Sequence, residues 1–347
     1  MAERTTRRRG PTIVDVAARA GVSKSLVSLV MRGEPNVSDT KRAAVLAAAA
    51  ELGYRPNAMA QGLVRNRTFV IGVMLSDLHN PFFTAVVDGI SATAHDADYQ
   101  ALINTGDRSA AREVEAVETL LRLRTDGIVL AGTVIDPSVI DRLGREVPVV
   151  LASRESTSRV VDSVVTDDVA GIGLAVDHLV GLGHRSVAHI TGGRGAGAKN
   201  RAKGYRRAMR RHGLADQMRL VTGSYTETGG AEGVAALWDG GVPPTGIVAP
   251  NDLAALGVLQ ALETLGRRVP EDVSVVGYDD SSLAALSHVA LTSVRQDTAE
   301  IGATAVELLI ERMDGGRAGS RHLILDPAFT VRSTTAPSRT LGRGVSW

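Results

Sequence analysis

The 347-residue chain contains no cysteine. This absence excludes disulfide bonds, thiolate metal sites and cysteine nucleophiles. No apolar run reaches the roughly 18 residues that a membrane-spanning helix needs, and no signal peptide is evident, so we expect a cytoplasmic protein with no membrane partner. Metal-binding spacings such as HExxH are also missing, and we expect neither a metal nor a cofactor.

The net charge is only +1, but the basic residues are unevenly distributed. The first eleven residues, MAERTTRRRGP, carry four arginines against one glutamate. A basic arm beside a DNA-binding unit would suit phosphate contact, whereas the arm alone is equally consistent with a solvated tail. The length and the 44% hydrophobic content predict two or three domains with buried cores.

The stretch 12–33, TIVDVAARAGVSKSLVSLVMRG, predicts two short helices separated by Gly-Val-Ser. Thr12 suits the N-cap of the first helix, Gly21 its left-handed end, and Ser23 the N-cap of the second. Packing of the apolar face of the second helix leaves an outward face composed of Lys24, Ser25, Ser28, Leu29 and Arg32. This pattern is typical of a helix-turn-helix that enters the DNA major groove, although an α-hairpin that only packs has the same spacing.

A third helix is predicted from 37–40 to Leu52, with Gly53 as its end. The helix-breaking Tyr54-Arg55-Pro56-Asn57 follows, and residues 58–65 form a short helical candidate. We therefore predict a helix-turn-helix domain with its basic arm over 1–56 and a hinge helix over 57–67.

From Phe69 onward, apolar strands alternate with amphipathic helices, as in a parallel α/β sheet. The predicted strands are 69–75, 100–104, 127–131, 147–152, 186–191, 220–222, 246–249, 273–277 and 291–294. One sheet of nine or more strands would be unusual for a body of this length, so the pattern favours two doubly wound lobes. The body is predicted to cover 68–336, followed by a tail over 337–347.

Polar residues follow many of these strands. Ligands of open α/β sheets bind beyond the carboxyl ends of the strands. The residues at these ends are Ser76, Asp77, Ser153, Arg154, Asn251, Asp252, Asp279, Asp280, Arg295 and Gln296, with Arg201 near the start of a helix. They supply the carboxylates, amides and guanidinium that hold a polyhydroxylated molecule, and Phe82, Phe83 and Tyr225 could face a sugar ring. Any one of them could instead only cap a helix.

The motifs IVDVAARAGVS, NVS followed by ELGYRPN, SDLHNPFF, NRAKGY, APNDLAALG, SVVGYDD and LTSVRQD occur in this order from Thr12 to about Arg332. This order resembles the lactose-repressor-type (LacI/GalR) family of bacterial transcription regulators. The resemblance implies a DNA-binding unit joined to a periplasmic-binding-protein-like body in which the chain crosses between lobes three times. It implies that 298–313 returns to the first lobe and that the last strand runs back towards the second.

The resemblance also implies roles for individual residues. The expected DNA contacts are Thr12, Ser23, Lys24, Ser25, Ser28, Leu29, Arg32, Asn36, Tyr54, Asn57 and Leu63, of which Leu63 matches a leucine that wedges into the minor groove. The expected effector contacts are Ser76, Asp77, Phe82, Phe83, Ser153, Arg154, Arg201, Tyr225, Asn251, Asp252, Asp279 and Gln296. Ser153 stands where the family often has aspartate. Leu26, Leu29 and Arg32 stand where many members have threonine, arginine and asparagine, so the operator half-site is expected to differ.

Two other classes of protein remain open. An enzyme is suggested by the glycine-rich stretch 192–199 after a strand, but its spacing matches neither GxxxxGK[ST] nor a GxGxxG with a later acid. His184 and His189 flank a strand without an evident acid and nucleophile, which favours structural histidines. An architectural DNA binder without an effector is the second alternative, and the polar strand ends argue against it.

The sequence thus predicts a DNA-binding transcription regulator without catalytic activity, with repression as the favoured mode. We expect a homodimer on a pseudopalindromic stretch of double-stranded operator DNA in the nucleoid, because one helix-turn-helix covers too few base pairs. A small sugar or sugar derivative is the expected effector. No C-terminal heptads are present to suggest a tetramer.

Overall fold

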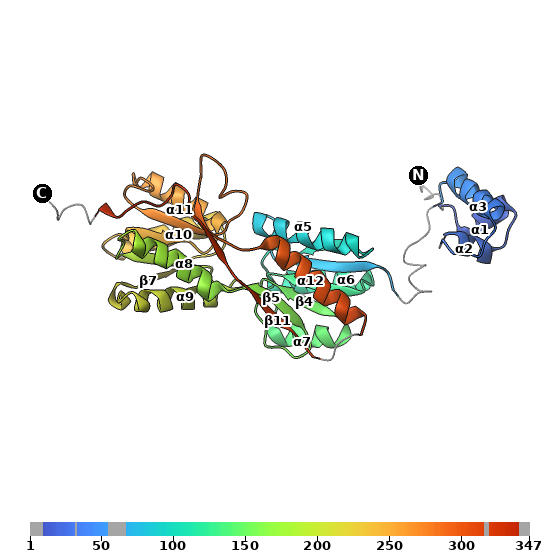
Figure 1. Ribbon diagram of the computed structural model, residues 1–347, viewed down its shortest axis with the longest axis horizontal. Helices are drawn as coiled ribbons and strands as arrows, with labels where there is room; N and C mark the ends of the chain where they lie inside the picture. The colour runs from blue at the N-terminus through green and yellow to red at the C-terminus, as the bar shows by residue number, and fades with distance from the viewer. Residues whose placement is uncertain (1–9, 32, 55–66, 316–318, 340–347) are drawn as a thin grey trace, which may run out of the picture. The chain divides into compact units, whose positions relative to one another are not determined.

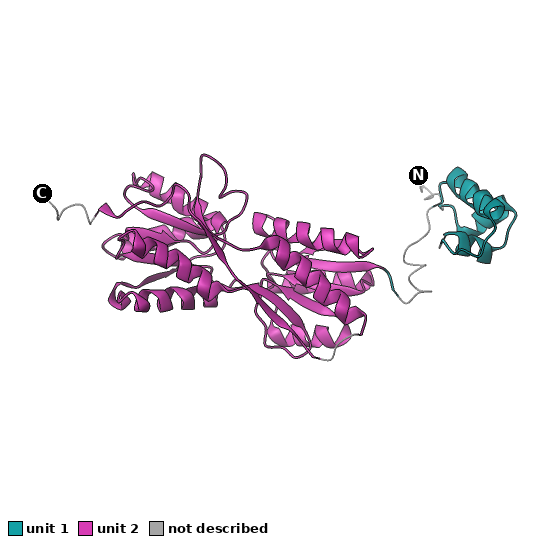
Figure 2. Ribbon diagram, viewed as in Figure 1, with its two compact units in different colours: residues 1–68 teal, residues 69–347 magenta. Residues whose placement is uncertain are grey.

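The computed structural model describes residues 10–31, 33–54, 67–315 and 319–339. The chain divides into two compact units, residues 1–68 and 69–347 (Figure 2). The predicted boundary between a DNA-binding domain and a hinge helix falls within 55–66, outside the described residues, and stays a prediction.

The described residues of the first unit form three helices, α1 (Ile13–Ala20), α2 (Lys24–Met31) and α3 (Asp39–Leu52). Their ends follow the predicted signals. Gly21 closes α1 with a φ of +65°, in the left-handed region that glycine adopts without strain. The hydroxyl of Ser23 accepts a hydrogen bond from the backbone N–H of Leu26 at 3.2 Å, which caps α2. The helix-turn-helix geometry is therefore encoded locally.

A small apolar core holds these helices together. Val16, Val27 and Val45, one from each helix, are fully buried in it. Leu29 was predicted to face outward with Lys24, but it is only half-exposed and packs against this core, because an apolar side chain gains by leaving water.

The described residues of the second unit form two six-stranded sheets, each covered by helices on both faces (Figure 1). The sheet of the first lobe has the strand order β11-β5-β4-β3-β1-β2 and is entirely parallel. Helices α5 and α12 pack on one face, and α6 and α7 on the other. The elements of this lobe are β1 (Val70–Leu75), α5 (Pro81–Asp96), β2 (Gln100–Thr105), α6 (Ala110–Arg122), β3 (Gly127–Ala131), α7 (Pro137–Glu146), β4 (Val149–Ala152), β5 (Asp162–Thr166), α12 (Thr298–Met313) and β11 (His322–Leu325).

The sheet of the second lobe has the order β12-β10-β9-β8-β6-β7, in which only the edge strand β12 is antiparallel to its neighbour. Helices α8 and α9 cover one face, and α10 and α11 the other. The elements are α8 (Asp168–Gly181), β6 (Val187–Thr191), α9 (Ala198–Arg211), the 3-10 helix η1 (Ala215–Gln217), β7 (Arg219–Thr222), α10 (Glu227–Asp239), β8 (Gly246–Val248), α11 (Asp252–Thr264), β9 (Ser274–Asp279), β10 (Thr292–Arg295) and β12 (Ala328–Thr330).

The chain crosses between the lobes three times, after β5, after β10 and after β11, as the family resemblance implied. Helix α12 returns to the first lobe and packs along α5. Every strand for which bounds were predicted is present with its ends within two residues, and β12 is the last strand that the resemblance implied, whereas β5 and β11 were not predicted. Strand β5 begins with Asp162, whose buried carboxylate is paired with Arg312 at 2.6 Å, and this polar start obscured the strand pattern.

Candidate functional site

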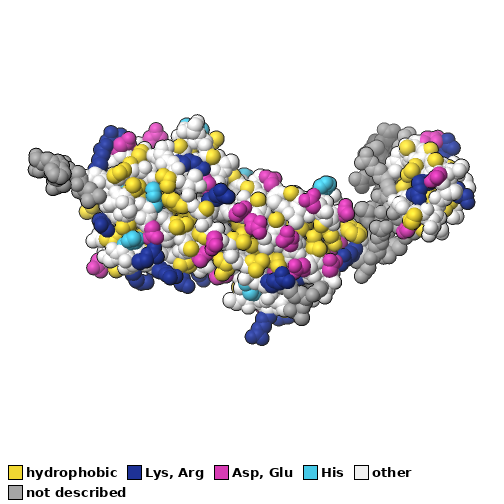
Figure 3. All heavy atoms as spheres, viewed as in Figure 1, with side chains coloured by type: hydrophobic (Ala, Val, Ile, Leu, Met, Phe, Trp, Pro, Cys, Tyr) yellow, Lys and Arg dark blue, Asp and Glu magenta, His cyan; other side chains and the backbone are white. Residues whose placement is uncertain are grey.

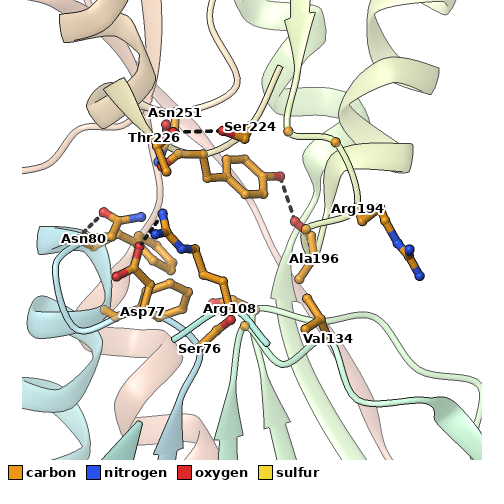
Figure 4. Close-up of a pocket in the computed structure, with 18 of the residues that line it drawn as sticks. Ser76, Asp77, Asn80, Arg108, Val134, Arg194, Ala196, Ser224, Thr226 and Asn251 are labelled. Carbon is orange, nitrogen blue, oxygen red and sulfur yellow. Dashed lines mark hydrogen bonds and ion pairs between the residues drawn. The ribbon is translucent and has the colours of Figure 1, made fainter. Parts of the chain in front are cut away.

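A cavity of about 910 Å³ lies between the two lobes, where the carboxyl ends of the strands face each other (Figure 4). Both lobes contribute side chains from the loops that follow their strands. Ten of the predicted effector contacts line it: Ser76, Asp77, Phe82, Phe83, Ser153, Arg201, Tyr225, Asn251, Asp279 and Gln296. The position agrees with the rule that open α/β sheets bind ligands beyond their carboxyl edge.

Arg201 forms the buried centre of this site. Its Nε donates to the Asp168 carboxylate at 2.8 Å, and Nη1 donates to the carbonyl of Pro250. The guanidinium carbon lies 3.7 Å from the ring centroid of Tyr278, a stacked geometry that suits arginine and not lysine. Burial alone would lower the pKa of Arg201, but the surrounding groups, of which the Asp168 carboxylate contributes most, together outweigh it and hold that pKa well above its usual value. The side chain is thus a fixed, charged fork.

Asp279 lies opposite this fork, with its Oδ1 at 4.0 Å from Nη1 of Arg201. Its backbone is held at a φ of +117°, a conformation that non-glycine residues rarely adopt and that tends to occur at ligand sites. Gln296 donates a hydrogen bond to Oδ1 at 2.7 Å. Burial raises the pKa of Asp279 well above its usual range, with Arg201 only partly opposing the effect. The oxygens of this carboxyl group can accept hydrogen bonds from ligand hydroxyls.

Aromatic rings form the apolar walls of the cavity. Phe82 and Phe83 meet edge to face, with ring centroids 5.2 Å apart, at the start of α5. From the other lobe, Tyr225 reaches across the glycine-rich loop and donates its hydroxyl to the carbonyl of Ala196 at 2.7 Å. A Cβ on Gly192 would lie 2.3 Å from this ring, so the glycine permits the close approach. The glycine-rich stretch thus makes room for a ring.

Ser153 gives the cavity a polar atom that lacks a partner. Its backbone φ is +59°, and its buried hydroxyl has no hydrogen-bond partner among the described residues. A buried polar atom without a partner is unfavourable, so a ligand or water hydrogen bond there would stabilise it.

Two predicted contacts, Arg154 and Asp252, are absent from the described residues that line this cavity. Arg154 turns away and donates to the carbonyls of Thr133 at 2.9 Å and Ile135 at 2.6 Å. The carboxylate of Asp252 accepts hydrogen bonds from the Ser293 hydroxyl and the Ser281 backbone N–H. Both side chains satisfy buried groups of their own lobe, the structural role that polar strand ends often have.

The buried position of Asp252 makes its stability contribution depend on pH. Burial raises the pKa of Asp252 to about 6 from an ordinary value of 3.8. A carboxyl group with a raised folded-state pKa contributes stability below the unfolded-state value, and this contribution is lost as the pH rises through the folded-state value. Here the loss falls between about pH 4 and pH 7.

Asp252→Asn removes this titration, so we expect the variant to gain stability relative to the wild type between about pH 4.5 and pH 7. The relative gain should be on the order of 1–3 kcal/mol. Urea unfolding of both proteins across this range measures it, with the exposed Asp96→Asn as the control. Parallel stability curves for Asp252→Asn and wild type would contradict the assignment.

Sequence reasoning missed Asp168, Tyr278 and Asn80. Asp168 follows β5, so recognition of that strand would have placed it among the strand-end residues. Tyr278 lies inside β9 as a fully buried aromatic, and the sequence contains no signal of its contact with arginine. Asn80 lines the cavity and accepts from the Phe82 N–H at 3.0 Å, and the Asn-Pro pair before a helix was its signal.

The predicted DNA contacts lie in the first unit. Lys24, Ser25 and Asn36 are exposed, Ser23 caps α2, and Thr12 donates its backbone N–H to the Asp15 carboxylate at 2.7 Å at the start of α1. Ser28, Leu29 and Tyr54 are half-buried, and Tyr54 packs on the helical core. Arg32, Asn57 and Leu63 lie outside the described residues, and their roles stay predictions.

The features that suggested an enzyme have structural roles. Burial lowers the pKa of His189 to about 4, and its Nδ1 lies 2.9 Å from the Val248 carbonyl. His184 lies within hydrogen-bond distance of the Thr245 hydroxyl and the Ala336 carbonyl. In the part of the chain that the structure describes, no three histidine or acidic side chains are grouped to hold a metal, and no helix is long and apolar enough to cross a membrane.

Comparison with known proteins agrees with both halves of this architecture. Residues 12–57 match the model of the bacterial regulatory proteins, lacI family, and residues 176–335 match a periplasmic binding protein-like domain. The catabolite control protein A of Priestia megaterium is 33% identical over 328 residues, which cover 93% of this chain and 99% of that protein.

Two solved structures extend the likeness to three dimensions. The lac repressor dimer bound to operator and the anti-inducer ONPF has a TM-score of 0.84 at 29% identity and covers 94% of this chain and 100% of its own. The complex of the transcriptional regulator CelR with cellobiose has a TM-score of 0.70 at 32% identity and covers 93% and 99%. These relatives are transcription regulators and not enzymes, and the chain belongs to the lacI family of bacterial regulatory proteins.

Proposed function

We propose that this protein is a transcriptional repressor that binds a pseudopalindromic operator as a homodimer. A small sugar-like effector either lowers or raises its affinity for the operator. The observation that carries the proposal is the coexistence, in one chain, of a helix-turn-helix and a cavity centred on the Arg201 fork. The helix-turn-helix recognises the DNA sequence. A ligand bound in the cavity shifts the equilibrium between arrangements of the two lobes.

DNA recognition is assigned to α2. Lys24 and Ser25 lie exposed in its first turn, the part of a recognition helix that contacts base edges. Leu29 cannot donate a hydrogen bond, so it is proposed to contact a thymine methyl group. A single unit of this kind reads too few base pairs for a genome, and two-fold symmetry doubles the site. The similar lac repressor structure is a dimer bound to operator, which supports this arrangement.

The effector is proposed to be a neutral or weakly charged polyol. The fork of Arg201 and the carboxyl of Asp279 suit vicinal hydroxyls, and Asn251 and Gln296 extend the polar lining. The rings of Phe83 and Tyr225 suit the apolar faces of a sugar ring. The cellobiose complex of a relative supports a carbohydrate ligand.

Two experiments test this proposal. Selection of DNA bound by the full chain should yield a two-fold related sequence, and a panel of mono- and disaccharides should give at least one increase in melting temperature. Enrichment of no sequence would contradict operator recognition. Failure of every sugar, with DNA binding intact, would instead contradict the assignment of the effector class.

We expect Gly192→Ala to weaken effector binding at least about tenfold, which corresponds to about 1.4 kcal/mol. The added methyl group would lie 2.3 Å from the Tyr225 ring and displace it from the wall of the cavity. Calorimetry with the sugar found above measures the change. Gly181→Ala is the matched control, because nothing lies within 4 Å of its added Cβ. Equal affinities for both variants would show that Tyr225 does not contact the ligand.

A further inference from the structure

Helix α9 carries an unusual charge. Seven of its 14 residues are lysine or arginine, and none is acidic. One of the seven, Arg201, belongs to the buried site. The other basic side chains are exposed and lie at helical spacing, at Lys199, Lys203, Arg206, Arg207, Arg210 and Arg211. Figure 3 shows dark blue side chains gathered along the edge of the second lobe where Figure 1 labels α9. We call these six residues the α9 basic face.

Few acidic groups neutralise this face. Arg211 pairs with Asp177 at 2.5 Å, and His212 lies 2.6 Å from the same carboxylate. Among the described residues, no carboxylate forms an ion pair with the other five. The face therefore presents at least five solvated cations on one side of a single helix, over roughly 16 Å at 1.5 Å per residue.

Helix stability does not account for this charge. Arg210 and Arg211 in the last turn complement the helix dipole, but Lys199 lies in the first turn, where a cation is unfavourable. Lys199, Lys203 and Arg207 follow one another at four-residue spacing, and like charges at that spacing repel. The arrangement therefore opposes folding of the helix, which points to a ligand that compensates for it.

We propose that the α9 basic face binds the phosphate backbone of double-stranded DNA, as a second contact independent of the helix-turn-helix. Arginines predominate on it, and their planar fork suits phosphate oxygens. A DNA duplex carries one negative charge per about 1.7 Å, so the length of the face matches roughly ten phosphates. The centres of protein interfaces are enriched in large aromatic anchors as well as arginine, whereas α9 presents no exposed large apolar side chain. The chemistry therefore favours DNA over an acidic protein.

The test measures how DNA affinity of the full chain depends on salt. The variant Lys203→Gln/Arg206→Gln/Arg207→Gln/Arg210→Gln is titrated against a non-operator duplex by fluorescence anisotropy. The matched control removes four exposed arginines elsewhere on the body: Arg142, Arg145, Arg159 and Arg267. Each phosphate contact adds about 0.9 to the slope of log K against log salt, so the α9 variant should lose about 2–4 from the slope. The control should lose less than about 0.5.

A second pair of proteins isolates the contact from the first unit. Lys24→Ala/Ser25→Ala weakens the recognition helix, and adding the four α9 substitutions to it should reduce the remaining affinity at least tenfold. Unfolding midpoints confirm that all variants are folded. Equal slopes of log K against log salt for the α9 variant and its control would overturn the proposal. The α9 basic face would then bind an acidic protein or only be solvated. Selection of operator DNA by the wild type tests the proposed function, and the salt dependence of the variants tests the α9 contact. Failure of one proposal can therefore be distinguished from failure of the other.

Discussion

Replacing Arg201 with alanine should abolish the effector response and lower the free energy of unfolding by about 3–5 kcal/mol. The guanidinium is buried, with 8% of its side chain exposed, and is the direct partner of Asp168. Its removal leaves that carboxylate unpaired in a poorly solvated site and exposes the face of Tyr278. The same change removes the donor fork proposed to hold vicinal hydroxyls, so binding and stability fall together.

Two variants separate these effects. Arg201→Lys keeps the charge but not the planar fork, and should recover part of the stability without restoring the response. Arg211→Ala, on the same helix, breaks an exposed pair with Asp177 and should change stability by less than about 1 kcal/mol. Urea unfolding gives the stabilities, and operator titration with and without sugar gives the response. A full response in Arg201→Ala would reassign Arg201 to a structural role.

Replacing Val27 with aspartate should reduce operator affinity by at least about 100-fold while leaving effector binding by the body unchanged. Val27 is fully buried where α2 meets the other helices. Small units of this kind have only about 3–5 kcal/mol of stability. An unpaired carboxylate in such a core is unfavourable by several kcal/mol, so the first unit should unfold.

Val14→Asp is the matched control, because Val14 belongs to the same unit but is 45% exposed. It should bind operator within about threefold of the wild type. Gel-shift titration measures affinity, and calorimetry measures sugar binding. Unchanged operator affinity in Val27→Asp would show that the helix-turn-helix is not the DNA-reading element. Lost sugar binding would show that the substitution disturbs the whole chain.

Local signals in the sequence predicted the first unit well. Helix caps, left-handed glycines and apolar spacing act over a few residues, so Gly21, Ser23 and Gly53 fixed the helix ends that the structure has. Leu29 faces outward only in part, because helical spacing does not show how wide the buried face of α2 is. The pattern of the sequence did not give the bounds of β11 and β12, because both are short, partly exposed edge strands that pair with segments distant in the chain.

The sequence predicted the position of the cavity, but only part of the set of residues that line it or support it. The rule of carboxyl strand ends located Ser76, Asn251 and Asp279, all of which line it. It could not tell which strand-end residues turn towards their own lobe, as Asp252 does, because the hydrogen-bond partners of Asp252, Ser281 and Ser293, lie far along the chain. Nor could this rule reveal Asp168. That residue follows β5, a strand that was not predicted because it begins with the charged residue Asp162.

Thermodynamic linkage between effector and operator tests the central claim most directly. The operator found by selection is titrated with and without the effector sugar, and the sugar is titrated with and without operator. We predict that the sugar changes operator affinity by about 5- to 150-fold and that operator changes sugar affinity by the same factor. Operator affinity that is identical with and without a sugar shown to bind would contradict the account, because the cavity and the DNA-binding unit would then act independently.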